Sequence, residues 1–232
     1  MAAPSTSPDQ TVREDTPIPH LTRAMWRVGA VALLCILVYP IFKFVDSLRD
    51  RFYVFDPPLL HDLARSAVAA HPGNTSDMVD FILANLTATY PGHTVALNTN
   101  RSEFFFNVAG GAMGVYLFIF GTPLGTEGHT GILTADDYFH ILEGEQWAFA
   151  PGSLGREIYR PGDVHLLPRG TAKQYKMPDG CFALEYARGW IPLMVPFGIA
   201  DTFSSTLDVP TLWTTARVTV REMVRNLRIG KI

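Results

Sequence analysis

The sequence has few cysteines, few charges and no excess of basic residues. Its 232 residues include two cysteines, Cys35 and Cys181, in segments of different character, so we expect no disulfide framework. Charged residues make up 18% of the chain, and the formal net charge is −3. A nucleic-acid-binding domain carries a basic surface, which this composition does not supply, so no nucleic-acid partner is expected. The mean hydropathy of +0.12 is high for a soluble protein, and the apolar excess lies near the two ends of the chain.

The N-terminal end combines a polar tail with an apolar run. Residues 1–22 are predicted to form a disordered tail, because their first part is rich in Pro, Ser and Thr. The apolar run that follows reaches the roughly 20 residues of a spanning helix only if Arg27 and Lys43 extend toward the membrane interfaces. A cleaved signal peptide is the alternative, but no small-residue cleavage site follows closely. We therefore predict one transmembrane anchor over residues 23–46, in an orientation that the flanking basic residues leave open.

The remainder of the chain falls into three segments by residue pattern. Residues 47–103 are predicted to be a helical lead-in, with helices at His61–Ala70 and Ser76–Tyr90. Residues 104–190 contain short apolar stretches separated by Gly and Pro turns, which is typical of a β-sandwich or β-barrel. Residues 191–232 are apolar at first and then amphipathic and rich in arginine. This last segment fits helices lying in a membrane interface or helices packed on the barrel.

One carboxylate has unusual neighbours in a predicted strand. Alternation over residues 181–187 places Glu185 on the same face as Ala183 and Ala187, and the bulky side chains on the other face. If the face of Glu185 points inward, burial raises the pKa of its carboxyl, as a general acid near neutral pH requires. The alternative is that the bulky face points inward and Glu185 contacts water, as acidic residues usually do.

The run GDVHLLPRG, residues 162–170, matches the second sequence signature of cupin barrels. In cupins a metal-binding histidine follows three residues after the last glycine, and here that position is Lys173. An ammonium group has no lone pair for a metal, so we expect no metal site there. His129, His140 and His165 are isolated in the sequence, and for each we expect a hydrogen-bonded structural role. Catalysis would then depend on acids.

Five runs of residues carry a resemblance to a known family. They are GTEGHTG at 125–131, ADDYF at 135–139, AKQYKMP at 172–178, FALEYARGWIP at 182–192 and DTFSSTLD at 201–208. Together they resemble fungal C-8 sterol isomerase, to which the vertebrate sigma (type one) receptor is related. The resemblance implies a mainly β protein with helices: a cupin-like β-barrel, one N-terminal transmembrane helix and membrane-facing C-terminal helices. It also implies a homotrimer in the endoplasmic reticulum membrane that contacts membrane lipid.

The activity implied is a shift of the sterol B-ring double bond from C8 to C7 in ergosterol biosynthesis, without a cofactor. Such a shift adds a proton at C9, forms a cation at C8 and removes a proton from C7, so two carboxyl groups suffice. Glu185 matches the glutamate of the family's ligand site. Asp136 and Asp137 face opposite sides of a strand, so only one of them can point inward. For the second acid we choose Asp136, because it aligns with an acid in the related receptor; the alternative is that both lie in a polar loop. Tyr116, Trp147 and Tyr175 are candidate substrate-binding residues, with ordinary core packing as the alternative.

The chain departs from the family in one segment. Family members carry about ten more residues between the turn that ends here at Gly114 and the strand that begins here near Tyr116. The shortening leaves two alternatives to the enzyme: a non-catalytic ligand-binding membrane protein similar to the sigma receptor, or an inactive variant. The ADDYF, AKQYKMP and DTFSSTLD runs look like those of the fungal enzymes and favour the isomerase.

Overall fold

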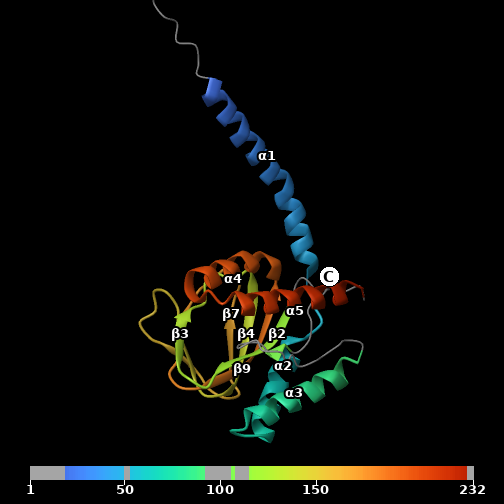
Figure 1. The fold of residues 1–232 in the computed structure, drawn as a ribbon, viewed down its shortest axis with the longest axis vertical. Helices are drawn as coiled ribbons and strands as arrows, with labels where there is room; N and C mark the ends of the chain where they lie inside the picture. The colour runs from blue at the N-terminus through green and yellow to red at the C-terminus, as the bar shows by residue number, and fades with distance from the viewer. Residues whose placement is uncertain (1–18, 50–52, 92–105, 108–114, 229–232) are drawn as a thin grey trace, which may run out of the picture. The chain divides into compact units, whose positions relative to one another are not determined.

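The computed structural model describes residues 19–49, 53–91, 106–107 and 115–228 (Figure 1). The chain divides into two compact units, Met1–Leu48 and Arg49–Ile232. In the first unit, residues Pro19–Leu48 form one helix, α1. Its stretch Ala24–Leu48 has a mean hydropathy of 2.3 and 25 residues. At 1.5 Å per residue this stretch is about 37 Å long, enough to cross the hydrocarbon core of a bilayer. The predicted N-terminal apolar helix is confirmed.

The second unit begins with two helices whose boundaries follow local signals. Helix α2 (Pro57–Ala70) starts four residues earlier than predicted, because Pro57 and Pro58 suit the first turn, where no N–H donor is needed. Helix α3 (Thr75–Thr89) is capped by the Asn74 side chain, which accepts the backbone N–H of Asp77 at 3.2 Å.

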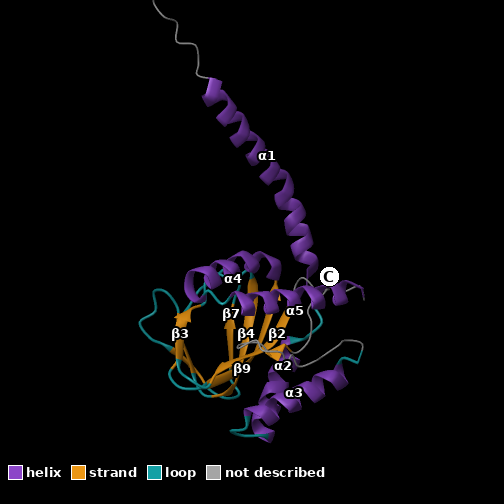
Figure 2. Cartoon of the chain, in the orientation of Figure 1, coloured by secondary structure: helices purple, strands orange, loops and turns teal. Residues whose placement is uncertain are grey.

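Two antiparallel sheets form the centre of this unit (Figure 2). One has the strand order β1-β2-β9-β4-β7 and the other β3-β8-β5-β6. Their inner faces pack together in a cluster that joins Met177 of β8 to Ile141 of β4 and Ala183 of β9. The predicted cupin-like barrel is thereby confirmed. The strands are β1 (Phe106–Asn107), β2 (Val115–Thr122), β3 (Thr126–His129), β4 (Ala135–Glu143), β5 (Gln146–Phe149), β6 (Glu157–Tyr159), β7 (Val164–Leu167), β8 (Gln174–Met177) and β9 (Cys181–Gly189).

Strand β9 is the middle strand of its sheet and is buried on both faces. Leu184 and Tyr186 pack outward against a core that includes Leu60 of α2 and Ile82 of α3. The Tyr186 hydroxyl donates to the backbone carbonyl of Phe55 at 2.9 Å. The other face of β9 lines the space between the two sheets. Since helices cover one face and a second sheet covers the other, the strand offers no face to bulk water.

The chain ends in helices that lie side by side over one end of the strands (Figure 1). Val218 is buried and Met223 packs beside Ile191 and Ala187, so this segment contacts the barrel as one alternative predicted. Its other side exposes large apolar residues, among them Trp213 at 69%. The elements are a 3₁₀ turn (Ile191–Met194), α4 (Val195–Asp201), a π-helical turn (Thr202–Thr206) and α5 (Val209–Arg228).

Candidate active site

Glu185 lies on the inner face of β9, flanked by small residues. Its neighbours across the strands are Phe118 of β2 and Phe139 of β4. Ala183 and Ala187, two residues away on either side, are buried on the same face. Glu185 itself is only half-buried although it points between the sheets. The residues beside its carboxyl group on this face therefore carry only methyl side chains, as the alternation predicted.

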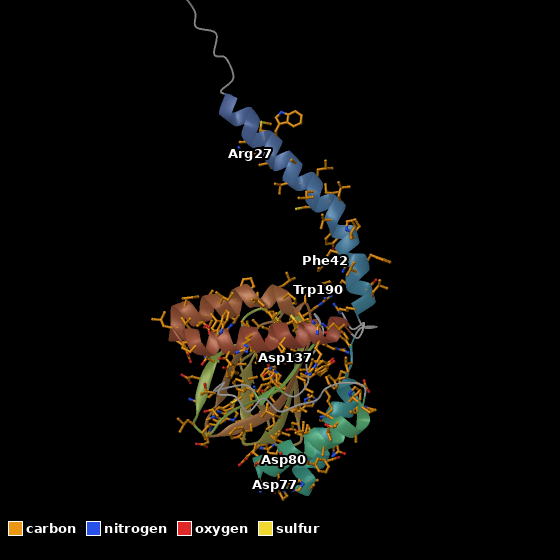
Figure 3. The ribbon with its side chains drawn as sticks, turned by 45° about the vertical axis from the view of Figure 1, so that its right-hand side comes forward. Arg27, Phe42, Asp77, Asp80, Asp137 and Trp190 are labelled. Carbon is orange, nitrogen blue, oxygen red and sulfur yellow. The ribbon has the colours of Figure 1, made fainter. Side chains whose placement is uncertain are left out.

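Asp137 of β4 lies next to Glu185 on the same inner face. It pairs in register with Ala187 of β9 and Leu167 of β7, and its side chain is 8% exposed. Figure 3 shows Asp137 among the strands of the barrel. The two carboxyl groups share a hydrogen bond. The second carboxylate oxygen of Asp137, Oδ1, is buried without a partner among the described residues, so it is available to a ligand.

The pair holds its protons more tightly than ordinary carboxyl groups. Burial raises the pKa of Asp137 from 3.8 to about 7, and the hydrogen bond from Glu185 opposes this shift. Burial also raises the pKa of Glu185 well above its usual value of 4.5, and so do the charge of Asp137 and the hydrogen bond with it. Together the two carboxyl groups therefore retain a proton that an isolated surface carboxyl group would release. Above about pH 7 the pair carries one proton and one negative charge.

Asp136 faces the opposite side of β4. It pairs with Arg188, and its Oδ1 accepts the backbone N–H of Arg169 at 3.0 Å. Both aspartates belong to a regular strand rather than to a polar loop. Alternation therefore separates them, as expected, but the structure places Asp137 beside Glu185 and directs Asp136 away from it.

The three candidate pocket residues have different surroundings. Tyr175 pairs with buried Ala148 and faces inward, and its pKa is raised by burial and by the negative charges of Glu185 and Asp201. Trp147 faces the outside of the other sheet, where the Arg156 guanidinium lies 3.7 Å from the ring centroid. The structure therefore does not bring Trp147 to the carboxyl pair.

Tyr116 belongs to β2 and pairs with Ala187, but its side chain lies outside the described residues. The segment between Gly114 and Tyr116, where we expected the chain to be shortened, lies largely outside them too.

A second group of polar side chains occupies the barrel interior, and we refer to Gln146, Glu157, Tyr159, His165 and Lys173 as the Lys173 cluster. The Lys173 ammonium donates to Glu157 Oε2 at 2.6 Å and lies 3.2 Å from His165 Nε2. His165 Nδ1 lies 2.8 Å from Gln146 Oε1, and the Tyr159 ring stacks on the imidazole. The position that bears a metal-binding histidine in cupins thus holds an ion pair. In the part of the chain that the structure describes, no three His, Cys, Asp or Glu side chains gather as metal ligands would.

The isolated histidines take hydrogen-bonded structural positions. His129 Nδ1 accepts the backbone N–H of Gly131 at 3.0 Å, and His140 Nδ1 bonds the carbonyl of Leu184 at 3.0 Å. Together with the bonds of His165, these contacts confirm the structural role expected for each. The sequence analysis missed the ion pair of Glu157 with Lys173. The available signal was the position of Lys173, which is that of the metal-binding histidine in cupins.

Comparison with known proteins identifies relatives of this chain. Residues 32–231 match a family model described as "ERG2 and Sigma1 receptor like protein". The C-8 sterol isomerase erg2 of Aspergillus fumigatus is 54% identical over 211 residues, covering 87% of each chain. C-8 sterol isomerase of Pyricularia oryzae is also 54% identical and covers 87% of this chain and 95% of its own. Sigma non-opioid intracellular receptor 1 of Gallus gallus is 32% identical over 86% of this chain and 89% of its own.

Solved cupin structures are more distant. A cupin-2 domain protein from Shewanella frigidimarina has a TM-score of 0.32 and 11% identity, over 38% of this chain and 83% of its own. The family of the chain is shown by the family model, which matches most of its residues, and by the similarity to the fungal proteins. The chain belongs to the ERG2 and sigma-1 receptor family.

Proposed function

We propose that this protein is a sterol isomerase that moves the B-ring double bond from C8 to C7. The observation that carries the proposal is the hydrogen-bonded pair of Asp137 and Glu185, which faces the barrel interior and shares one proton near neutral pH. Relatives 50–54% identical that are named C-8 sterol isomerase support it. The apolar side chains beside the pair, such as Phe118 and Phe139, suit a substrate that is hydrocarbon apart from one hydroxyl group.

Each carboxyl group has a distinct role in the proposed reaction. Protonated Glu185 gives its proton to C9, which leaves a tertiary cation at C8. The negative charge of the pair stabilises this cation in a site where little water screens it. The Asp137 carboxylate then takes the proton from C7, and the new double bond forms between C7 and C8.

The hydrogen bond between the carboxyl groups also resets the site. After one turnover the proton from C7 is on Asp137, and Glu185 is a carboxylate. Because the two side chains are hydrogen-bonded, the proton can pass back from Asp137 to Glu185 through the bond they share. The reaction consumes no net proton, so the pair is ready for the next sterol without another acid or base.

The exposed side of the C-terminal segment supports access from a membrane. Phe197, Phe203, Val209 and Trp213 each expose about half or more of their surface, and Arg217, Arg221 and Arg225 on α5 are also exposed. An apolar surface bordered by arginines suits a bilayer interface, where a sterol is dissolved. The resemblance supports our further proposals that this membrane is the endoplasmic reticulum and that the protein assembles as a homotrimer.

Complementation of a yeast strain without C-8 isomerase tests the proposal through the sterol profile. The wild-type chain should restore Δ7 sterols, whereas Glu185→Gln and Asp137→Asn should accumulate Δ8 sterols at equal protein levels. Loss of a general acid or base costs on the order of 100-fold or more in rate. Asp136→Asn is the matched control, since it changes the adjacent aspartate on the other face. Wild-type-like profiles from both pair variants would exclude the assigned roles.

A non-catalytic ligand-binding protein is the second candidate, favoured by the sigma receptor relative and by the short segment after Gly114. Accumulation of Δ8 sterols by a well-expressed wild-type chain would favour this candidate or an inactive variant. In a receptor the single negative charge of the pair would attract a cationic ligand.

A further inference from the structure

The Lys173 cluster has hydrogen-bonding capacity left over. Burial lowers the pKa of His165 to about 4, so its imidazole is neutral at physiological pH. Because Gln146 Oε1 can only accept, His165 donates from Nδ1 and accepts from Lys173 at Nε2. An ammonium has three N–H donors, and Glu157 and His165 take two of them. The third has no partner among the described residues.

Glu157 has a free acceptor beside that free donor. Its Oε2 accepts from Lys173 and from the Tyr159 hydroxyl, each at 2.6 Å. Its Oε1 has no hydrogen-bond partner in the described part of the chain. A free donor next to a free acceptor is the arrangement that binds a hydroxyl group, which accepts one hydrogen bond and donates another.

The cluster and the carboxyl pair face the same interior. Phe139 of β4 pairs with Glu185 on one side and with His165 on the other, so all three lie in one row on the inner face. Two strand spacings separate Glu185 from His165, or about 10 Å between their backbones. Lys173 reaches this row from the opposite sheet, because its ammonium contacts the buried His165.

This backbone separation is of the same order as the length of a sterol ring system. Four bonds join C3 to C9 in the ring system and a fifth reaches the 3-oxygen, a span of about 6 Å. A reacting carbon lies about 3 Å from its acid, and a hydroxyl lies about 3 Å from its donor. The three lengths total about 12 Å when fully extended and about 10 Å with modest bending, so one ring system can reach both groups.

We propose that the Lys173 cluster binds the 3-hydroxyl group of the sterol and so sets which ring carbon faces Glu185. This proposal rests on the proposed isomerase function and names the recognition element of the same site. The third N–H of Lys173 donates to the hydroxyl oxygen, and the hydroxyl donates to Glu157 Oε1. Because Lys173 and Glu157 neutralise each other, the cluster orients the substrate without opposing the cation at C8.

The test compares a Δ8 sterol with its 3-deoxy analogue on the purified full-length protein. Wild type should prefer the hydroxylated sterol at least about 10-fold in kcat/KM, because the analogue leaves an N–H of the Lys173 ammonium, whose side chain is 13% exposed, without its hydrogen-bond partner. Lys173→Met should bring this ratio close to one. Lys176→Met is the matched control, since Lys176 lies on β8, three residues after Lys173, but pairs with exposed Glu127 on the outside. It should keep the wild-type ratio.

The ratio is a property of the folded fraction alone, so partial misfolding of a variant does not change it. If Lys173→Met yields no folded protein, Glu157→Gln replaces it and should also lower the ratio. A wild-type enzyme without preference for the hydroxyl, or a preference that survives in Lys173→Met, overturns the proposal. Loss of the preference in Tyr175→Phe alone overturns it too, and places the hydroxyl at Tyr175. If wild type converts neither sterol, the isomerase function itself fails.

Discussion

Burial of the Asp137 carboxyl should weaken the fold above neutral pH. Its pKa rises from 3.8 to about 7 because only 8% of the side chain is exposed. A raised pKa means that the folded state binds the proton more tightly than the unfolded state. The stabilisation by this proton is complete below about pH 4 and is lost as pH rises through about 7. At 1.36 kcal/mol per pH unit the loss amounts to about 4 kcal/mol at pH 8.

Asp137→Asn keeps the shape of the side chain but removes this ionisation. At pH 5 the folded wild type holds the proton and the unfolded chain has released it, which costs the wild type about 1–2 kcal/mol. At pH 8 the cost is about 4 kcal/mol, so the advantage of the variant should grow by about 2–3 kcal/mol between the two values. For a unit of this size that is a shift of about 5–10 °C in the difference between melting temperatures. The measurement is thermal unfolding in detergent at pH 5 and pH 8.

Two comparisons make the result decisive. Buried histidines such as His140 and His165 titrate alike in wild type and variant, so their contributions cancel in the difference. Asp136→Asn should follow the wild-type pH dependence, because the carboxylate of Asp136 faces the other side of β4. Parallel melting curves for Asp137→Asn and wild type across this pH range would refute the burial of an ionisable pair. The variant should be more stable and inactive, an exchange of stability for activity that functional sites often show.

Two further predictions follow from the site and its support. The rate of isomerisation should fall as pH decreases through about 7, since protonation of Asp137 removes the base that accepts the proton from C7. A profile of initial rates from pH 5 to pH 9 that stays flat would contradict this prediction. Gly189→Ala should destabilise the protein by about 2 kcal/mol or more, because at a φ of 154° an added Cβ would lie 2.6 Å from the Cα of Ala135 and from the carbonyl oxygen of Thr134. Unfolding by denaturant measures this loss of stability. Gly152→Ala is the control for replacing a glycine of positive φ, because Gly152 lies at a turn with open space around it.

The face on which Glu185 lies follows from the sequence, but the burial of that face does not. Alternation groups Glu185 with Ala183 and Ala187 and sets them against Leu184 and Tyr186. The two alternatives assumed that one face would be buried and one exposed. Both are covered, because α2 and α3 pack on one side and the second sheet on the other. Which helices cover a strand depends on contacts distant in sequence, and a local pattern does not contain them.

The choice between Asp136 and Asp137 also depends on contacts between residues distant in sequence. Alternation places them on opposite faces, and either could be the inner one. Register decides, because Asp137 pairs with Ala187, which shares its face with Glu185. That pairing joins residues 50 positions apart, so the separation of the two aspartates was predictable and the identity of the inner one was not.

Strands β3 and β8 show why the Lys173 cluster was harder to foresee. Their sequences, TEGH and QYKM, lack the apolar alternation of a half-buried strand. They become strands by pairing with each other, Thr126 with Met177 and His129 with Gln174. Without β8 the direction of Lys173 could not be assigned, although the resemblance to cupins pointed to its position.

The carboxyl pair explains why acid chemistry can operate here near neutral pH. A lone exposed carboxyl group would be ionised and could not donate a proton, whereas a lone buried one would be neutral and could not accept one. Two carboxyl groups joined by a hydrogen bond hold one proton between them and so provide both states in one site. This requires burial, which raises both pKa values, and small neighbours, which leave room for a ring carbon. Ala183 and Ala187 meet the second requirement, and exchanging either for a larger residue would fill the space where the sterol must approach Glu185.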